Sequence, residues 1–403
     1  MFELVRVVVA GQALAAHDPK LLLELVEAYY IEQEDEDDDW SGWSGGLLDD
    51  GIRNHSSRGG DPLASYLHGP FLAMFRADYR GGVALLNRML DHAARFRVRR
   101  SAARRYEMGA DDPAETGEVL SITGEPREYA GDGQVWPWYR GTGSGPYPCM
   151  SALLALECVT EEYIEAGAPP AALTGIMTAD AHSLAMPALA LAVLVRHLED
   201  AGDALDPYLV EPAVWEFEFS RAIADQTSGL VARAPELAHP ERRGWSLREV
   251  SMMLALTADG DRIRQLEDVG DRLEENARRE LGEDPSPSAR EHLAAVRNWA
   301  AGLDRSSYET RQEEDCFVIQ QVADPDVERV LAATNAELRR TNDAVGLVVR
   351  HAHVRDNGGR APDIAPDVLR ADLALARDLL DDPPQSYGFS SDGPVAVAAT
   401  AVE

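Results

Sequence analysis

Apolar residues recur at helical spacing along most of the chain. Between 149 and 166, Leu153, Leu156, Val159 and Tyr163 fall on one face, the three-and-four-residue spacing of an amphipathic helix. The same pattern predicts helices over 1–34, 62–100, 170–201, 207–225, 246–281, 286–303, 306–321, 325–354 and 364–381. We therefore expect an all-α protein, an irregular α-solenoid or multi-helical bundle with a long Gly/Pro-rich connection.

The first helical region is predicted to span residues 1–106. Within it, two helices should meet at Asp18, whose side chain can cap the second helix while Pro19 occupies its first turn. Periodicity stops at 32–61, an acidic stretch rich in Gly and Ser that indicates a surface loop.

A connection dense in Gly and Pro follows at 107–148 and contains a strand-like segment at 119–123. It is the predicted boundary between the two helical regions. The second, repeat-like region covers 149–382, and the tail at 383–403 is expected to be loose.

Charge and cysteine content limit the function classes. The 403 residues carry a formal net charge of -32, which disfavours a general binder of nucleic acids or anionic membranes. Three cysteines without a CxxC pair are typical of free thiols in a reducing cytoplasm. The longest apolar stretch, 184–195, is well short of the ~18 residues that span a bilayer. We expect a cytoplasmic protein without a membrane partner.

Motifs for cofactors and catalysis are missing from the sequence. Lys20, the single lysine, follows no glycine loop, so a phosphate-binding P-loop is absent, and the glycine-rich 141–146 is interpreted as an ordinary turn. The acidic run 34–39 and the pair His351 and His353 are weak metal candidates and are interpreted as a solvated linker and a helix end. We therefore predict no catalytic residue, cofactor or metal ligand, although a carboxylate pair could still meet in space.

One segment is positively charged although the chain as a whole is strongly negative. Residues 76–105 contain nine arginines and two acids, and on the predicted helix Arg88, Arg95 and Arg99 lie opposite the apolar residues. These three arginines are the candidate partner- or anion-binding residues. The favoured alternative is that the Arg76–Arg105 strip neutralises acidic neighbours within the protein or on a partner.

The connection carries an aromatic cluster. Trp136, Trp138, Tyr139 and Arg140 offer amphipathic rings and a guanidinium, which suit a ligand or peptide groove. The favoured alternative is that they anchor the connection to the core.

Two segments carry a family resemblance. The sequences at 69–87, GPFLAMFRADYRGGVALLN, and at 136–153, beginning WPWYR, are similar to parts of large, uncharacterised actinobacterial ATP-binding proteins of STAND-like type. In those proteins a P-loop ATPase is joined to a long helical region. The resemblance covers about residues 1–230, and no active-site residue is carried over from it. This sequence departs from those proteins because it does not contain the ATPase module.

The resemblance implies a non-enzymatic helical scaffold or sensor module. Such a module would bind a protein partner and work with a P-loop ATPase supplied in trans. One alternative is an all-α enzyme, an α/α-toroid hydrolase or lyase with a carboxylate pair in an aromatic-lined pocket. A second alternative is nucleic-acid contact through the Arg76–Arg105 strip.

Overall fold

The computed structural model describes eleven stretches of the chain: residues 2–31, 48–55, 64–107, 117–142, 145–227, 235–281, 286–313, 316–322, 325–351, 364–381 and 392–402. The acidic run 34–39 and His353 lie outside these residues, as does most of the predicted loop at 32–61.

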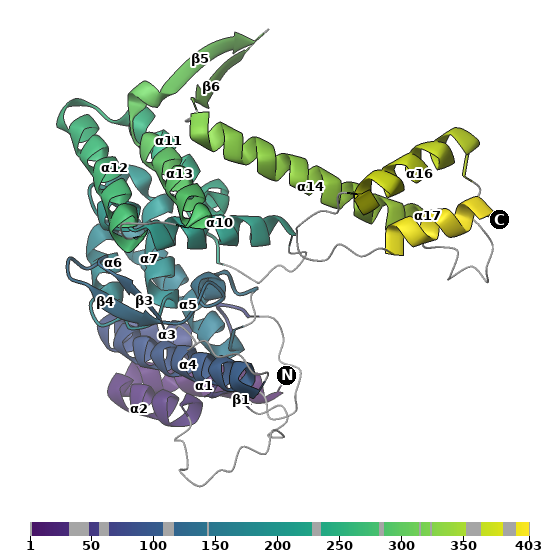
Figure 1. The fold of residues 1–403 in the computed structure, drawn as a ribbon. Coiled ribbons are helices and arrows are strands. Elements are labelled where there is room, and N and C mark those ends of the chain that lie inside the picture. Colours follow the sequence, from purple (N-terminus) through teal and green to yellow (C-terminus); the bar gives the residue numbers. More distant parts are fainter. Residues whose placement is uncertain are drawn as a thin grey trace. The chain divides into compact units, whose positions relative to one another are not determined.

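The protein is mostly helical, so the predicted all-α class is confirmed (Figure 1). The α-helices, in chain order, are α1 (Phe2–His17), α2 (Pro19–Tyr30), α3 (Phe71–Ala77), α4 (Tyr79–Glu107), α5 (Tyr147–Glu165), α6 (Pro170–Thr178), α7 (Ala185–Arg196), α8 (Leu198–Ala201), α9 (Asp206–Leu209), α10 (Pro212–Thr227), α11 (Leu247–Thr257), α12 (Gly260–Leu281), α13 (Pro287–Ala301), α14 (Pro325–His351), α16 (Pro366–Asp381) and α17 (Asp392–Val402).

Three short 3₁₀ helices and three two-stranded sheets complete the described structure. The 3₁₀ helices are η1 (Trp136–Arg140), η2 (Pro240–Gly244) and η3 (Arg305–Ser307). The paired strands are β1 (Leu48–Asp49) with β2 (Ile52–Arg53), β3 (Gly117–Leu120) with β4 (Arg127–Ala130), and β5 (Tyr308–Glu313) with β6 (Cys316–Gln321).

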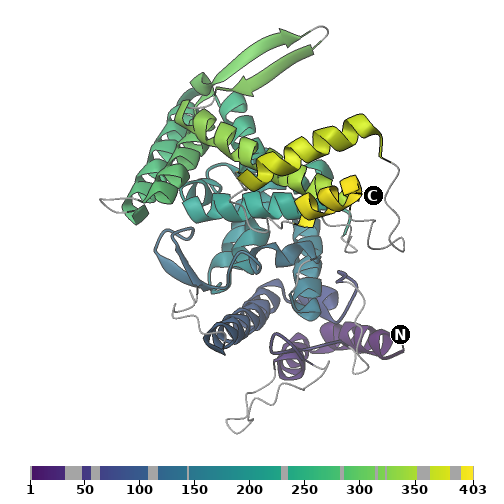
Figure 2. The same cartoon turned by 45° about the vertical axis from the view of Figure 1, so that its right-hand side comes forward.

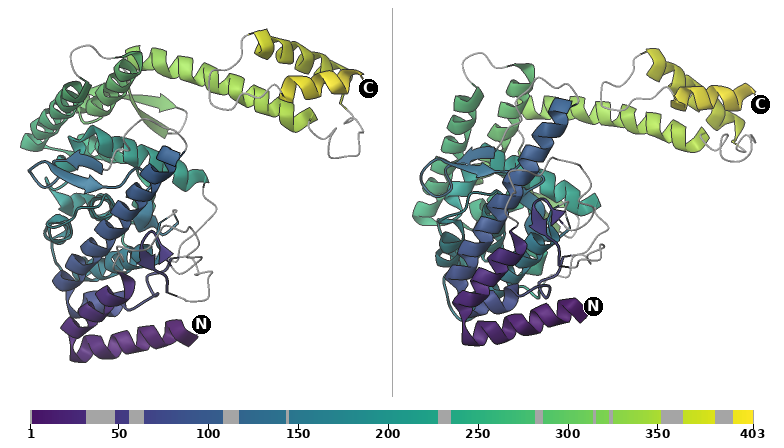
Figure 3. Two further views of the ribbon diagram at one scale, coloured as in Figure 1. Left: turned by 60° about the horizontal axis from the view of Figure 1, so that its bottom comes forward. Right: turned by 90° about the horizontal axis from the view of Figure 1, so that it is seen from below.

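The first two helices meet as the sequence predicts. Asp18 is the N-cap of α2, where its Oδ1 accepts a hydrogen bond from the Leu21 N–H at 3.1 Å, and Pro19 occupies the first position. Leu22, Val26 and Tyr30 bury one face of α2. Helix α2 contacts both α1 and the long α4 (Figure 3).

The connection is tied to the helices that follow it. Strands β3 and β4 pair antiparallel, with Gly117 opposite Ala130. Two backbone hydrogen bonds then join Ala130 to the residues on either side of Ser183. The Ala130 N–H donates to the His182 carbonyl, and the Leu184 N–H donates to the Ala130 carbonyl. The strand predicted at 119–123 is present in part, because β3 spans Gly117–Leu120 and ends before Ser121.

The central core is built around α5 and α7. Helix α7 is buried over most of its length because it is apolar on nearly all sides, and α5 is buried from Pro148 to Glu157. The fully covered residues of α7 include Leu189, Val193, Ala188 and Ala190. These two helices carry the buried charges described below.

The prediction of a helix at 306–321 is wrong. Strands β5 and β6 occupy most of it. The physical reason is composition: Phe317, Val318 and Ile319 are aromatic or β-branched residues, which lose rotamer freedom in a helix and fit a pleated strand.

Packing divides the chain into two compact units. The first comprises Met1–Glu283 and Trp299–Tyr308, and the second comprises Asp284–Asn298 and Glu309–Glu403. The described parts of the predicted connection lie inside the first unit, so packing places the division later in the chain than composition does.

The second unit contains a small core of its own. Helix α14 contacts α16 and α17 (Figure 2). Their shared core is formed by Ala344, Leu347, Ala376, Leu379 and Val397. The tail that we expected to be loose is therefore helical at Asp392–Val402, because its small apolar residues pack against α14 and α16.

Candidate functional site

Helix α4 carries the arginine strip with the orientation predicted from the sequence. Its apolar face is fully buried at Leu86, Met89, Leu90 and Ala93. The three candidate residues Arg88, Arg95 and Arg99 are exposed on the other side. The helical spacing therefore identified the inward and outward faces correctly.

Acidic residues of the same chain pair with much of the strip. Arg88 donates from Nε and Nη2 to the two carboxylate oxygens of Glu27 on α2, at 2.8 and 2.7 Å. Arg95 donates to Asp91 at 2.8 Å, one helical turn away. These pairs support the interpretation that the strip neutralises acidic neighbours.

Replacing Arg88 with glutamine tests that interpretation. Because the Arg88 and Glu27 side chains are 51% and 41% exposed, we expect the free energy of unfolding to fall by about 1 kcal/mol or less. Urea unfolding measures the change, and the exposed Arg264→Gln is the control. A salt-sensitive affinity for DNA that disappears in the Arg88→Gln variant would instead support the nucleic-acid alternative.

The aromatic cluster is part of the core. Trp136 and Trp138 are 0% exposed and Tyr139 is 2% exposed. Trp136 donates from Nε1 to Glu218 at 2.7 Å and stacks on Phe217. Burial raises the pKa of Tyr139 to about 12. These rings anchor the connection to the helices, as the favoured alternative expects. They do not line an open groove.

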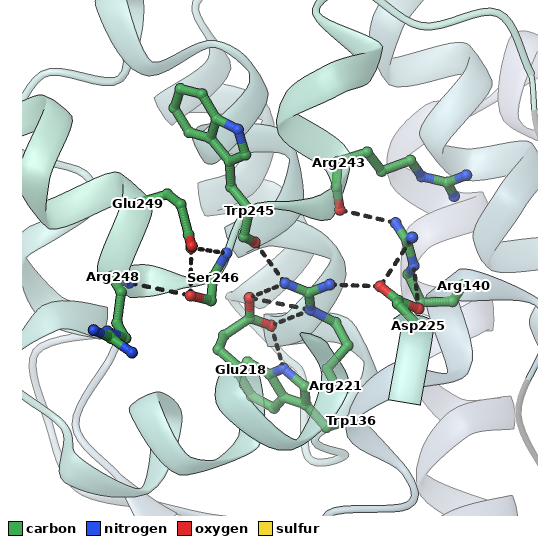
Figure 4. Close-up of polar contacts among 10 residues, drawn as sticks. All are labelled: Trp136, Arg140, Glu218, Arg221, Asp225, Arg243, Trp245, Ser246, Arg248 and Glu249. Carbon is green, nitrogen blue, oxygen red and sulfur yellow. Dashed lines mark hydrogen bonds and ion pairs between the residues drawn. The ribbon is translucent and has the colours of Figure 1, made fainter. Parts of the chain in front are cut away.

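A buried ion network surrounds this anchor (Figure 4). On α10, Glu218, Arg221 and Asp225 are spaced by three and four residues, so their side chains meet on one face. Arg221 donates to both carboxylates and to the Trp245 carbonyl. Burial by itself would lower the pKa of Arg221, but Tyr139, Glu218 and Asp225 raise it above its ordinary value.

Arg140 joins the connection to this network. It forms an ion pair with Asp225 at 3.0 Å and donates from Nη1 to the Arg243 carbonyl at 3.0 Å. Nearby, α11 begins with a capping box in which Ser246 and Glu249 satisfy each other's backbone N–H groups. Arg140 is therefore a structural cation in this region.

A second buried network lies between α5 and α7. Arg196 is 0% exposed and faces two carboxylates one turn apart on α5: it donates from Nη1 to Glu161, and its Nη2 lies 3.5 Å from Glu157. His197 also contacts Glu161, at 3.1 Å. Arg243 donates to Glu157 at 2.9 Å and so links the two networks. Burial raises the pKa of Glu161, but the hydrogen bonds from His197 and Arg196 outweigh it and hold the pKa at about 2.

The acids of these two networks are poor candidates for a catalytic carboxylate pair. A hydrolase or lyase needs carboxylates that can reach a substrate and exchange a proton with it. Glu157, Glu161 and Glu218 are instead almost completely buried and bound by arginines. Glu216, two positions before Glu218 on the same helix, is exposed.

Most members of the two networks were not predicted from the sequence. The spacing of Glu218, Arg221 and Asp225 along one helix was a readable signal. Arg196 had no such signal, because its partners on α5 lie 35 and 39 positions earlier in the chain.

In the second unit, His351 lies at the end of α14 and is completely buried. Its Nε2 lies 2.8 Å from Asp372 Oδ2 and its Nδ1 lies 3.1 Å from the Thr400 hydroxyl. That hydroxyl donates to the Ala396 carbonyl at 2.9 Å, so its single proton is already used and it is not an activated nucleophile. The three side chains link α14, α16 and α17. In the part of the chain that the structure describes, no group of three or more His, Cys, Asp or Glu side chains could hold a metal ion.

An apolar groove of about 420 Å³ lies between α1 and α2. Its lining includes Leu14, Leu22, Leu25, Val26 and Tyr29. On α2, Leu21, Leu25 and Tyr29 form a row at four-residue spacing and are 40%, 49% and 38% exposed. The Arg53 guanidinium lies 5.4 Å from the Tyr29 ring centroid at the edge of the groove. The groove can accept an apolar side chain row from another protein.

Within the described residues, the helices are too short or too polar to span a lipid bilayer. Comparison with known proteins identified no protein family that matches the chain, and no curated protein sequence matches it.

Proposed function

We propose that the chain is a non-enzymatic helical scaffold or sensor module that binds a protein partner and works with a P-loop ATPase supplied by another chain. The observation that carries the proposal is the exposed row Leu21, Leu25 and Tyr29 beside the α1–α2 groove. An amphipathic partner helix placed in such a groove would bury these side chains at the spacing of its own turns.

The distribution of charge supports binding over catalysis. The buried acids Glu157, Glu161 and Glu218 are neutralised by arginines of the chain itself. The ion pairs of Glu157 and Glu161 connect helices of the first unit, which also contains the groove. An exposed apolar row on an otherwise strongly acidic surface is typical of an interaction site.

The ATPase partner and the cellular compartment are parts of the same proposal. The ATPase is implied by the similarity of 69–87 and 136–153 to STAND-like proteins. A cytoplasmic location agrees with the Cys158 thiol, which is not part of a disulfide, since a reducing compartment keeps thiols in this state.

Co-expression tests the proposal. We expect a P-loop ATPase encoded next to this chain to co-purify with it, and Leu25→Asp to reduce the complex at least tenfold because it places a charge in the apolar groove. Val119→Asp is the matched control, since Val119 is 62% exposed on β3 and lies outside the groove.

Two results would overturn the proposal. One is robust ATP hydrolysis by the isolated chain, which would make it an enzyme. The other is a complex that survives Leu25→Asp unchanged while circular dichroism shows that the variant is folded.

A further inference from the structure

Strands β5 and β6 form a sheet of only two strands. A two-stranded sheet is marginally stable in water by itself, and each outer edge presents backbone N–H and C=O groups without ladder partners. In the described part of the chain, no third strand pairs with either edge. The sheet therefore has room for an added strand.

The two edges differ in their protection. Proteins discourage unwanted pairing by placing charges on edge strands. Strand β5 has Glu309, Arg311 and Glu313 at alternate positions, whereas β6, from Cys316 to Gln321, has no charged residue. The unprotected edge is thus that of β6.

The side chains of β6 add a second observation. Phe317 is 72% exposed and Ile319 is 43% exposed, and because they are two positions apart they share one face of the strand. Val322, just beyond the strand, is 51% exposed. An added strand would cover both the backbone edge and this apolar row.

The charge around the sheet indicates the chemistry of the occupant. Residues 308–322 contain four acidic residues and one arginine, and two of the acids, Glu314 and Asp315, stand between the strands in the sequence. With a net charge of -32 on the whole chain, a second copy would be repelled. An extended segment with basic residues would be attracted.

We propose that the free edge of β6 binds an extended, basic segment of a partner protein by strand addition. Backbone hydrogen bonds to β6 provide the affinity, and alternate apolar side chains of the segment pack on Phe317 and Ile319. The net negative charge of residues 308–322 attracts its lysines or arginines. This surface belongs to the second unit and goes beyond the proposed α1–α2 groove, on which it does not depend.

Fluorescent nine-residue peptides test the proposal with the full chain. The probe alternates valine and threonine and carries lysine at both ends; the comparison peptides replace lysine with glutamate or methylate the backbone nitrogens. We expect only the basic, unmethylated peptide to bind, and the double variant Phe317→Ser, Ile319→Ser to weaken binding at least tenfold. The matched control is Val345→Ser, Val349→Ser on α14, whose residues are 55% and 63% exposed in the same unit.

A second measurement uses the unmodified chain and does not depend on a variant folding. Bound basic peptide should slow amide hydrogen exchange at 316–322. Equal binding of the methylated peptide, equal loss in the α14 control, or unchanged exchange at 316–322 would each overturn the proposal. So would a concentration-dependent dimer that the β6 double variant abolishes, because the occupant would then be a second copy.

Discussion

Replacing Arg196 with methionine should lower the free energy of unfolding by about 3–5 kcal/mol. Arg196 is fully buried and faces Glu157 and Glu161 on α5. Methionine has a similar volume but no charge, so both carboxylates would stay buried with only Arg243 and His197 to compensate them. Removing one member of a buried ion network costs this much because the other members are left desolvated.

Urea unfolding followed by tryptophan fluorescence measures this change. All seven tryptophans fall in the residue ranges of the first unit, so the signal reports the unit that contains Arg196. Arg76→Met is the matched control: Arg76 pairs with Glu162, the neighbour of Glu161 on the same helix, but its side chain is 52% exposed. A loss for Arg196→Met no larger than for Arg76→Met would contradict the assigned network.

Mild acid should destabilise the first unit through His55. Burial, with a smaller contribution from His68, lowers the pKa of His55 to about 3 from an ordinary value near 6.5. The folded state thus holds this imidazole neutral while the unfolded state protonates it below pH 6.5. Stability from this group is full above pH 6.5 and is lost as the pH falls toward 3, by about 2 kcal/mol at pH 5.

The comparison of unfolding at pH 7 and pH 5 tests this assignment. His55→Gln should remove most of the pH dependence in this interval, although it costs stability at pH 7 because the His55 Nδ1 contact with the Tyr30 hydroxyl, at 3.0 Å, changes. His17→Gln, at the exposed end of α1, is the control and should leave the slope as it is. An unchanged slope in His55→Gln would show that other groups carry the acid sensitivity.

Local patterns predicted those features that depend on nearby residues. The junction at Asp18 follows from capping chemistry and one proline, and the buried face of α4 follows from helical spacing; both agree with the structure. The helix predicted at 306–321 is wrong, because the strand preference of Phe317, Val318 and Ile319 outweighs the helical periodicity of the segment.

For the candidate sites, the sequence did not predict which side chains are exposed. Trp136 and Trp138 have the composition of a binding groove, but whether such rings face solvent or the core depends on helices far along the chain, here α10 through Glu218. Exposure is a property of packing, so composition alone could not separate the two interpretations. The unprotected edge of β6 could not be predicted either, because helical periodicity predicts a helix over this segment.

The sequence by itself determined the helical class, the strongly acidic surface, the absence of a P-loop, and the inward and outward faces of α4, because each depends on composition or on spacing within a few turns. Only the tertiary structure decided which acids meet which arginines, that the aromatic cluster is an anchor, and where apolar side chains remain exposed. Those outcomes require residues such as Glu161 and Arg196 to approach across tens of positions. Such approaches follow from how whole helices pack, which no short stretch of sequence encodes.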